Sequence, residues 1–315
     1  MRTSLRIDRL PFRSFGRQCW NFLLPRPFVN LFANPFRRIS LLLVGLVISA
    51  GVIGMLVLQF VKGALIERAG QSLELAAADA ADKLDRHLVE RYGDIQMMAH
   101  AFTAQIDNPT YLSAYLSRMR EAYPFYMWLA VTDAEGKIVA STDAIWLGQD
   151  RRTTTWFQSV RTQRQIAVQE AQPYVETGGV RAVAFSAQLI DASGKFHGVV
   201  TSLVGIPTLA DLFQQAQGVF RLHVGPQAQP EYIVVATNGE AIIDSIFHEE
   251  EAVNLAELVS VNRVMASNVP GYVAERTLRG QRKVITGYAK TRGYGTFTGL
   301  TWGILVRVDQ NHVLG

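Results

Sequence analysis

An uninterrupted apolar segment, Ile39–Val61, constrains this chain more than any other feature. It runs for 23 residues without a charged side chain. At ~1.5 Å per residue, a helix of this length crosses the ~30 Å hydrocarbon core of a bilayer with a slight tilt. A cleaved signal peptide is the alternative, but its apolar region is usually ~7–15 residues long and ends at a small-x-small site, which residues 64–70 do not offer. We therefore predict a transmembrane helix over residues 39–61.

Positive charge is concentrated directly before this segment. Residues 1–38 hold eight arginines against Asp8 alone, so the chain's net charge of +4 leaves −3 for the remaining 277 residues. Because Arg37 and Arg38 flank one end of the apolar segment and only Lys62 and Arg68 lie close to the other, the positive-inside rule places the N-terminus in the cytoplasm and residues 63–315 outside it. A basic character confined to this leader argues against nucleic acid as a partner.

The composition predicts a packed, non-catalytic chain outside the membrane. Hydrophobic residues make up 49% of the sequence and charged residues 18%, which excludes a disordered chain. The single cysteine, Cys19, rules out an intramolecular disulfide and any cysteine-based metal centre. The histidines have no metal-ligand spacing, the run His248–Glu251 is interpreted as a helix N-terminus, and no catalytic or nucleotide-binding motif is present. We expect no catalytic residue, no bound metal and no cofactor.

Helical periodicity follows the apolar segment. From Ala64 to about Phe102, apolar residues recur every three or four positions, and a second helix is predicted over Tyr111–Ala122. The first of these would reach about 55–60 Å, longer than one small domain needs, so we expect a long stalk helix that runs along two stacked modules. Its apolar positions are Ile66, Ala69, Leu73, Ala76, Ala80, Leu84, Leu88, Tyr92, Ile95, Met98 and Phe102.

Strand patterns then occur twice in a similar order, which predicts an α+β fold with two tandem modules of antiparallel sheet. The first module contains predicted strands Tyr126–Thr132, Lys137–Ser141, Val180–Ile190 and Lys195–Ile206, a helix at Thr153–Thr162, and a closing helix after Pro207. The second contains strands Glu231–Thr237, Glu240–Asp244, Gly271–Leu278, Gln281–Lys290 and Leu300–Asp309, with a helix at Glu249–Met265.

These patterns divide the chain into five parts. They are a basic cytoplasmic leader (1–38), a transmembrane helix (39–61), the long and second helices (63–123), a membrane-distal module (124–217) and a membrane-proximal module (218–310).

Several runs together resemble one known family. They are DAEGKIVAST (133–142), GQDRRTTTWFQSV (148–160), the strand pair in 172–206, IVVATNGEAIID (233–244), KVITGYAKTRG (283–293) and LTWGILVRVD (300–309). Their order and spacing after one transmembrane helix resemble the double Cache family of bacterial extracytoplasmic sensors, over about Gly63–Asp309. The resemblance implies two PAS-like modules, of which the distal one binds a small ligand and the proximal one relays the signal.

The resemblance also implies where the ligand would bind. Family members that bind amino acids have an aromatic pair, here Trp156 and Phe157, and an arginine two positions before the tryptophan, where this chain has Thr154. Their upstream tyrosine corresponds to Gln149, and their acidic residue after the next tyrosine corresponds to Glu176. Arginine would clamp a carboxylate and an acidic group would pair with an ammonium.

Half of this set is therefore replaced, and Arg152 or Arg151, each within one helical turn of Thr154, is the candidate substitute.

We also expect Tyr126 and Trp128 to share one face of the first strand, as pocket wall or as core. The alternative for the aromatic pair is ordinary packing of one of its members, because adjacent helix residues point apart. The candidate ligand residues are Trp156, Phe157, Glu176, Thr154, Arg152, Trp128, Tyr126 and Tyr174.

We expect the chain to be the sensor region of a bacterial inner-membrane receptor of the histidine kinase, diguanylate cyclase or chemoreceptor type, with its output region beyond Gly315. The ligand would be a small amine, amino acid or carboxylate, and the signal would pass along the stalk helix. A homodimer is predicted to form through an alanine-rich helix face that includes Ala69, Ala76 and Ala80. The alternative is a single-pass anchored binding or adaptor protein that acts through a partner protein.

Overall fold

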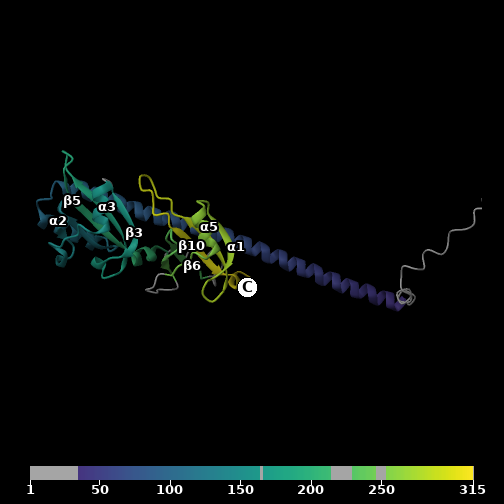
Figure 1. Cartoon of the computed structure of the whole chain (residues 1–315). Helices are drawn as coiled ribbons and strands as arrows, with labels where there is room; N and C mark the ends of the chain where they lie inside the picture. Colours follow the sequence, from purple (N-terminus) through teal and green to yellow (C-terminus); the bar gives the residue numbers. More distant parts are fainter. Residues whose placement is uncertain (1–34, 164–165, 214–228, 246–252, 315) are drawn as a thin grey trace, which may run out of the picture. The chain divides into compact units, whose positions relative to one another are not determined.

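The structure, a computed structural model, describes residues 35–163, 166–213, 229–245 and 253–314 (Figure 1). The chain divides into two compact units, Met1–Lys62 and Gly63–Gly315. Three of the sequence predictions lie outside the described residues. They are the leader up to residue 34, which includes Cys19, the end of the helix after Pro207, and the helix start at residues 248–251.

Helix α1, Pro35–Thr103, is one unbroken helix that contains both the predicted transmembrane segment and the predicted stalk (Figure 1). Among the described residues it is the one helix with the length and apolar composition to cross a membrane. The most apolar stretch of α1 is exposed along its whole length among the described residues. From Ala69 onward, by contrast, one face of α1 is buried in the main hydrophobic core.

The alanine-rich face of α1 packs inside the chain, so the predicted dimer contact through Ala69, Ala76 and Ala80 is wrong. Ala69 and Ala80 are buried and Ala76 packs against the same core. Small residues at this contact allow a sheet to lie directly on the helix. A Cβ atom at Gly287 would overlap the backbone of Leu73.

The first module is an antiparallel five-stranded sheet with strand order β2-β1-β5-β4-β3. The second predicted helix is α2, Pro109–Ala122, whose first turn is capped by the side chain of Asn108. The other elements of this module are β1 (Tyr126–Thr132), β2 (Ile138–Ser141), the 3-10 turn η2 (Ala144–Trp146), α3 (Thr155–Gln163), β3 (Ala167–Pro173), the 3-10 turn η3 (Val175–Thr177), β4 (Arg181–Ile190) and β5 (Phe196–Gly205).

Strand β3 is absent from the sequence prediction. Its sequence, AVQEAQP, has polar residues at three of seven positions, two of them adjacent, so it shows no alternation typical of a half-buried strand. It forms the sheet edge and pairs only with β4. An edge strand can carry such residues because one side of its backbone stays unpaired.

The second module repeats this topology, with strand order β7-β6-β10-β9-β8. Its elements are β6 (Glu231–Val235), β7 (Ala241–Asp244), α5 (Val259–Ala266), β8 (Gly271–Arg276), β9 (Lys283–Lys290), β10 (Gly303–Asp309) and the short α6 (Gln310–Leu314). The predicted α+β fold with two antiparallel modules is therefore confirmed.

Helix α5 begins later than the sequence predicts. Residues 253–258, inside the predicted helix Glu249–Met265, are not helical. The backbone of Val253 instead accepts a hydrogen bond from Ala241, and Leu255 donates to Gly239, so this segment runs beside β7. Tertiary pairing has replaced the helical hydrogen bonds that the local sequence favours.

Each sheet has one face toward α1 and one face away from it. The faces toward α1 form a single core with residues from both modules, such as Leu129 and Val306. The away-facing side of the first sheet carries a second cluster around Trp128, and that of the second sheet carries a third around Leu305. The modules also touch directly, since Trp302 donates its indole N–H to Glu170 at 2.6 Å and Arg181 pairs with Glu240 at 2.7 Å.

Candidate functional site

An aromatic cluster covers the away-facing side of the first sheet. Trp128 projects from β1, Trp156 and Phe157 come from the first turn of α3, and Tyr174 lies between β3 and η3. The ring centroids of Trp128 and Trp156 are 6.3 Å apart at an interplanar angle of 60°, a favourable edge arrangement. Both members of the predicted aromatic pair are buried, so each packs onto the sheet.

Tyr126 does not share this face, and the prediction that it lies on the same side as Trp128 is wrong. The pairing of β1 with β5 shifts register between these two residues, which adds one residue to β1. A bulge of this kind moves a side chain to the opposite face. Tyr126 therefore belongs to the core that contacts α1, while Trp128 belongs to the aromatic cluster.

Arg151 and Glu176 form a shielded ion pair beside the aromatic cluster. Arg151 Nε lies 2.9 Å from Glu176 Oε1, and the two side chains are 15% and 5% exposed. The distance is that of an ion pair, but Arg151 Nε makes no aligned hydrogen bond among the described residues. The guanidinium also donates to Gln149 Oε1 at 3.1 Å and lies 4.8 Å from the centre of the Trp146 ring.

Arg151 is one of the two arginines that the sequence offers in place of the missing one. It contacts Gln149 and Glu176, the residues at the upstream-tyrosine and acidic positions. Thr154 serves a different purpose, because its hydroxyl and its N–H both donate to the Arg151 carbonyl and close the turn before α3. Arg152 is exposed and pairs with exposed Asp150, so the structure does not bring it to this cluster.

The indole N–H of Trp156 is buried and has no hydrogen-bond partner within the described parts of the chain. That of Trp128, in contrast, donates to Ser141 Oγ at 3.1 Å. A buried N–H without an acceptor costs about 1–3 kcal/mol, and such a group in a native structure calls for an explanation. An acceptor supplied by a ligand would satisfy it.

Tyr174 completes the polar rim of the cluster. Its hydroxyl accepts a hydrogen bond from Gln172 Nε2 at 2.8 Å. Burial raises the pKa of Tyr174, and the nearby Glu176 carboxylate acts in the same direction. The phenol therefore stays neutral at physiological pH.

Nothing in the sequence indicates that Trp146 and Gln149 contact the Arg151 guanidinium. Trp146 lies in η2, a turn that the sequence did not predict. Gln149 and Arg151 are two positions apart in an irregular loop. In a helix or strand the spacing of two residues indicates whether they share a face, but in a loop it does not.

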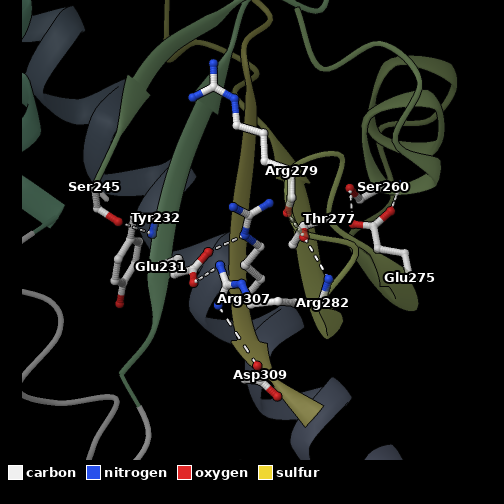
Figure 2. A network of polar contacts seen from close by, with 10 residues as sticks. All are labelled: Glu231, Tyr232, Ser245, Ser260, Glu275, Thr277, Arg279, Arg282, Arg307 and Asp309. Carbon is white, nitrogen blue, oxygen red and sulfur yellow. Dashed lines mark hydrogen bonds and ion pairs between the residues drawn. The ribbon is translucent and has the colours of Figure 1, made fainter. Parts of the chain in front are cut away.

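The corresponding face of the second module carries a network of charged side chains next to its apolar cluster. Figure 2 shows Glu231 between two guanidinium groups, with Arg307 Nε at 2.5 Å and Arg282 Nη2 at 2.9 Å. Glu231 and Arg307 are both buried. The cavity beside this network measures about 30 Å³, room for about two water molecules. Within the described ranges, no group of three or more histidine, cysteine or acidic side chains is arranged to hold a metal ion.

Comparison with known proteins agrees with this architecture. The profile of the double Cache family, described as Cache domain, matches residues 61–315. No curated protein gives a significant sequence match.

Several solved structures share the fold at low sequence identity. The extracellular domain of the proposed histidine kinase rpHK1S-Z16 is 14% identical with a TM-score of 0.63, covering 78% of this chain and 96% of that one. The ligand-binding domain of the Pseudomonas fluorescens chemoreceptor CtaA, in complex with L-leucine, is 16% identical with a TM-score of 0.56, covering 80% and 100%. That of the Pseudomonas aeruginosa PAO1 amino acid chemoreceptor PctB, in complex with L-Arg, is 15% identical with a TM-score of 0.55, covering 78% and 97%.

The profile match extends over most of the chain, and the repeated five-stranded topology is the one that the family resemblance implies. This chain is a member of the Cache domain family, with a double Cache region at residues 61–315.

Proposed function

We propose that this chain is the extracytoplasmic sensor region of a bacterial transmembrane receptor and that its first module binds a small amino acid. The carrying observation is the shielded Arg151–Glu176 pair beside the buried, unpartnered Trp156 indole N–H. In this proposal the N-terminus is cytoplasmic, residues 63–315 lie outside the cytoplasm, and the division into leader, membrane helix, helical segment and two modules follows the boundaries predicted from the sequence.

The chemistry of the pair supports a zwitterionic ligand. A guanidinium recognises a carboxylate through charge-assisted hydrogen bonds, and Arg151 Nε has none that is aligned. Glu176 would hold an ammonium group, and the indole N–H of Trp156 would donate to the ligand carboxylate. The flanking rings of Trp146 and Trp128 supply apolar surface and attraction for a cation.

The ligand would separate Arg151 from Glu176 and would replace their ion pair by two, one between Arg151 and the ligand carboxylate and one between Glu176 and the ligand ammonium. Each protein charge keeps an opposite partner throughout, which limits the desolvation cost that an isolated buried charge would carry. Domain-closure movements of this kind can bias α1 between two states, because α1 packs against the opposite face of the same sheet.

Calorimetry on the full chain in detergent, with L-leucine, L-serine and L-arginine as probes, tests the proposal. We expect at least one of them to bind, and the variants Arg151→Gln, Glu176→Gln and Trp156→Phe each to weaken binding by about tenfold or more. Arg152→Gln is the matched control, because Arg152 is next to Arg151 in the sequence but is exposed and pairs with the exposed Asp150.

Binding that survives all three variants would refute the assignment of the site. If none of the three amino acids binds, the proposed amino-acid site is refuted and the membrane-anchored adaptor is favoured.

A further inference from the structure

A second cavity, of about 270 Å³, lies between α1 and the second module. It is separate from the aromatic cluster, which belongs to the first sheet. Its lining comes from α1, from the end of β9 and from the segments next to β8 and β9. The lining residues are Ala78, Ala81, Asp82, Asp85, Pro270, Ala289, Lys290, Arg292 and Gly293.

One wall of this cavity carries a buried carboxylate. Asp85 is 5% exposed, and its Oδ2 accepts a hydrogen bond from the backbone N–H of Arg292 at 2.7 Å. Its Oδ1 is buried and accepts no hydrogen bond within the described residues. Asp85 also has no cationic side chain within ion-pair distance there, whereas the neighbouring Asp82 is paired with Arg86 at 2.6 Å.

The second module contributes two cations to the lining, and these also lack carboxylate partners within the part of the chain that the structure describes. Lys290 Nζ donates to the carbonyl of Met265 at 2.7 Å, and Arg292 Nη2 donates to the carbonyl of Asn268. Backbone carbonyls satisfy single N–H groups but do not neutralise a charge. Apart from Asp82, which is paired with Arg86, the charged side chains of the lining are Asp85, Lys290 and Arg292, and none of these three forms an ion pair within the described residues.

From this charge pattern we propose that the cavity is a second ligand site, which takes a small amino acid with one ammonium and two carboxylate groups. The ammonium pairs with Asp85, and the carboxylates pair with Lys290 and Arg292. Such a ligand carries a net charge of −1 and balances the net +1 of the three groups. The small side chains of Ala78, Ala81 and Ala289 leave room for its carbon chain.

A ligand at this position bridges α1 and the hairpin that follows β9. Asp85 belongs to α1, while Lys290 and Arg292 belong to the second module. Occupancy would therefore stabilise one arrangement of α1 against the second sheet, independently of the ligand in the first module.

Titration calorimetry of the full chain in detergent tests this site, with L-glutamate as the probe. The Glu176→Gln variant serves as the background, so that binding in the first module is weakened. We expect L-glutamate to bind this background, and Asp85→Asn or Arg292→Gln added to it to weaken binding at least tenfold. Asp79→Asn is the matched control, because Asp79 is an exposed carboxylate of α1 that pairs with Lys83 and does not line the cavity.

Succinate, which has the two carboxylates but no ammonium, separates the roles of the groups. We expect succinate to bind at least tenfold more weakly than L-glutamate. Equal binding of the two, or no loss in Asp85→Asn, would overturn the role of Asp85. Absence of L-glutamate binding to the background would overturn the second site without touching the first, whose probes and variants are different.

Discussion

Tyr126 donates its phenolic hydrogen to Asp94 Oδ2 at 2.6 Å and so ties the first strand of the first sheet to α1. Asp94 also accepts a hydrogen bond from Arg91 Nε at 2.9 Å, and the Arg91 guanidinium lies 3.9 Å from the centre of the Phe125 ring. Burial, reinforced by the Asp94 carboxylate, raises the pKa of Tyr126. The bulge that turns Tyr126 away from the aromatic cluster thus gives it a structural role on the sheet face toward α1.

The Tyr126→Phe variant removes this hydrogen bond with little change in shape. Hydrogen bonds to charged groups contribute about 1.5–3 kcal/mol, so we expect a loss of unfolding free energy of that size. Denaturant unfolding followed by circular dichroism measures it. Tyr115→Phe is the control, because the Tyr115 hydroxyl makes no hydrogen bond within the described residues; equal losses in both variants would contradict the assigned role of Asp94.

Gly287 on β9 is expected to tolerate no side chain. A Cβ atom there meets the backbone of Leu73 on α1, and neither backbone can move without disturbing its sheet or helix. Overpacking of this kind costs about 1–3 kcal/mol, so Gly287→Ala should lower the unfolding free energy by that amount.

Gly93→Ala is the matched control for this substitution. Gly93 lies within α1 and has open space around its Cβ position, so alanine should raise stability by about 0.8–1 kcal/mol through helix propensity. A neutral effect of Gly287→Ala would mean that α1 and β9 are not in direct backbone contact.

The buried carboxylate of Asp85 predicts a pH-dependent difference between the wild-type chain and Asp85→Asn. Burial raises its pKa above the ordinary value of 3.8, although backbone N–H groups of Arg292 and Gly293 oppose the shift. The folded chain therefore binds the proton more tightly than the unfolded chain. The resulting penalty is absent below pH 3.8, grows as the pH rises to the folded-state pKa, and stays constant above it.

Asparagine does not titrate, so the stability of Asp85→Asn relative to wild type should increase as the pH rises from 3.8 into the neutral range. Unfolding free energies of both chains, measured without added ligand across this range, check the sign. A relative stability of the variant that falls with rising pH would contradict the raised pKa.

Homodimerisation stays a prediction, and the burial of the alanine-rich face restricts where it can occur. On α1, Leu75 is 71% exposed, whereas Ala80 is 2% exposed. In a Cys19→Ser background, we expect Leu75→Cys to form a disulfide-linked dimer under mild oxidation and Ala80→Cys to form none. Crosslinking at Ala80 alone would contradict the packing of α1, and no crosslinking at either position would count against a dimer through this helix.

The sequence predicted the fold well because its strongest signals are periodic. Helix α2 and strands β1, β4 and β9 lie within three residues of their predicted bounds, since apolar alternation and turn residues mark them. Strand β3 was not predicted because its formation depends on pairing with β4 and not on its own composition. The late start of α5 has the same origin, as contacts with β7 replace local helical bonds.

Similar reasons decide which residues of the proposed site the sequence can indicate. Trp156, Phe157 and Glu176 could be identified by their order along the chain, but a one-residue bulge after Tyr126 leaves no mark in the sequence. The choice between Arg151 and Arg152 depends on which guanidinium the loop turns toward Glu176, and two adjacent identical residues carry no pattern that decides it.

The core shared by the two sheets has a consequence for how the chain unfolds. Residues of both modules and one face of α1 form a single hydrophobic cluster. Unfolding of either sheet would therefore expose apolar surface of the other sheet to water. The two modules should therefore melt together in one cooperative transition instead of as separate folding units. A substitution that destabilises either module would therefore unfold both modules together.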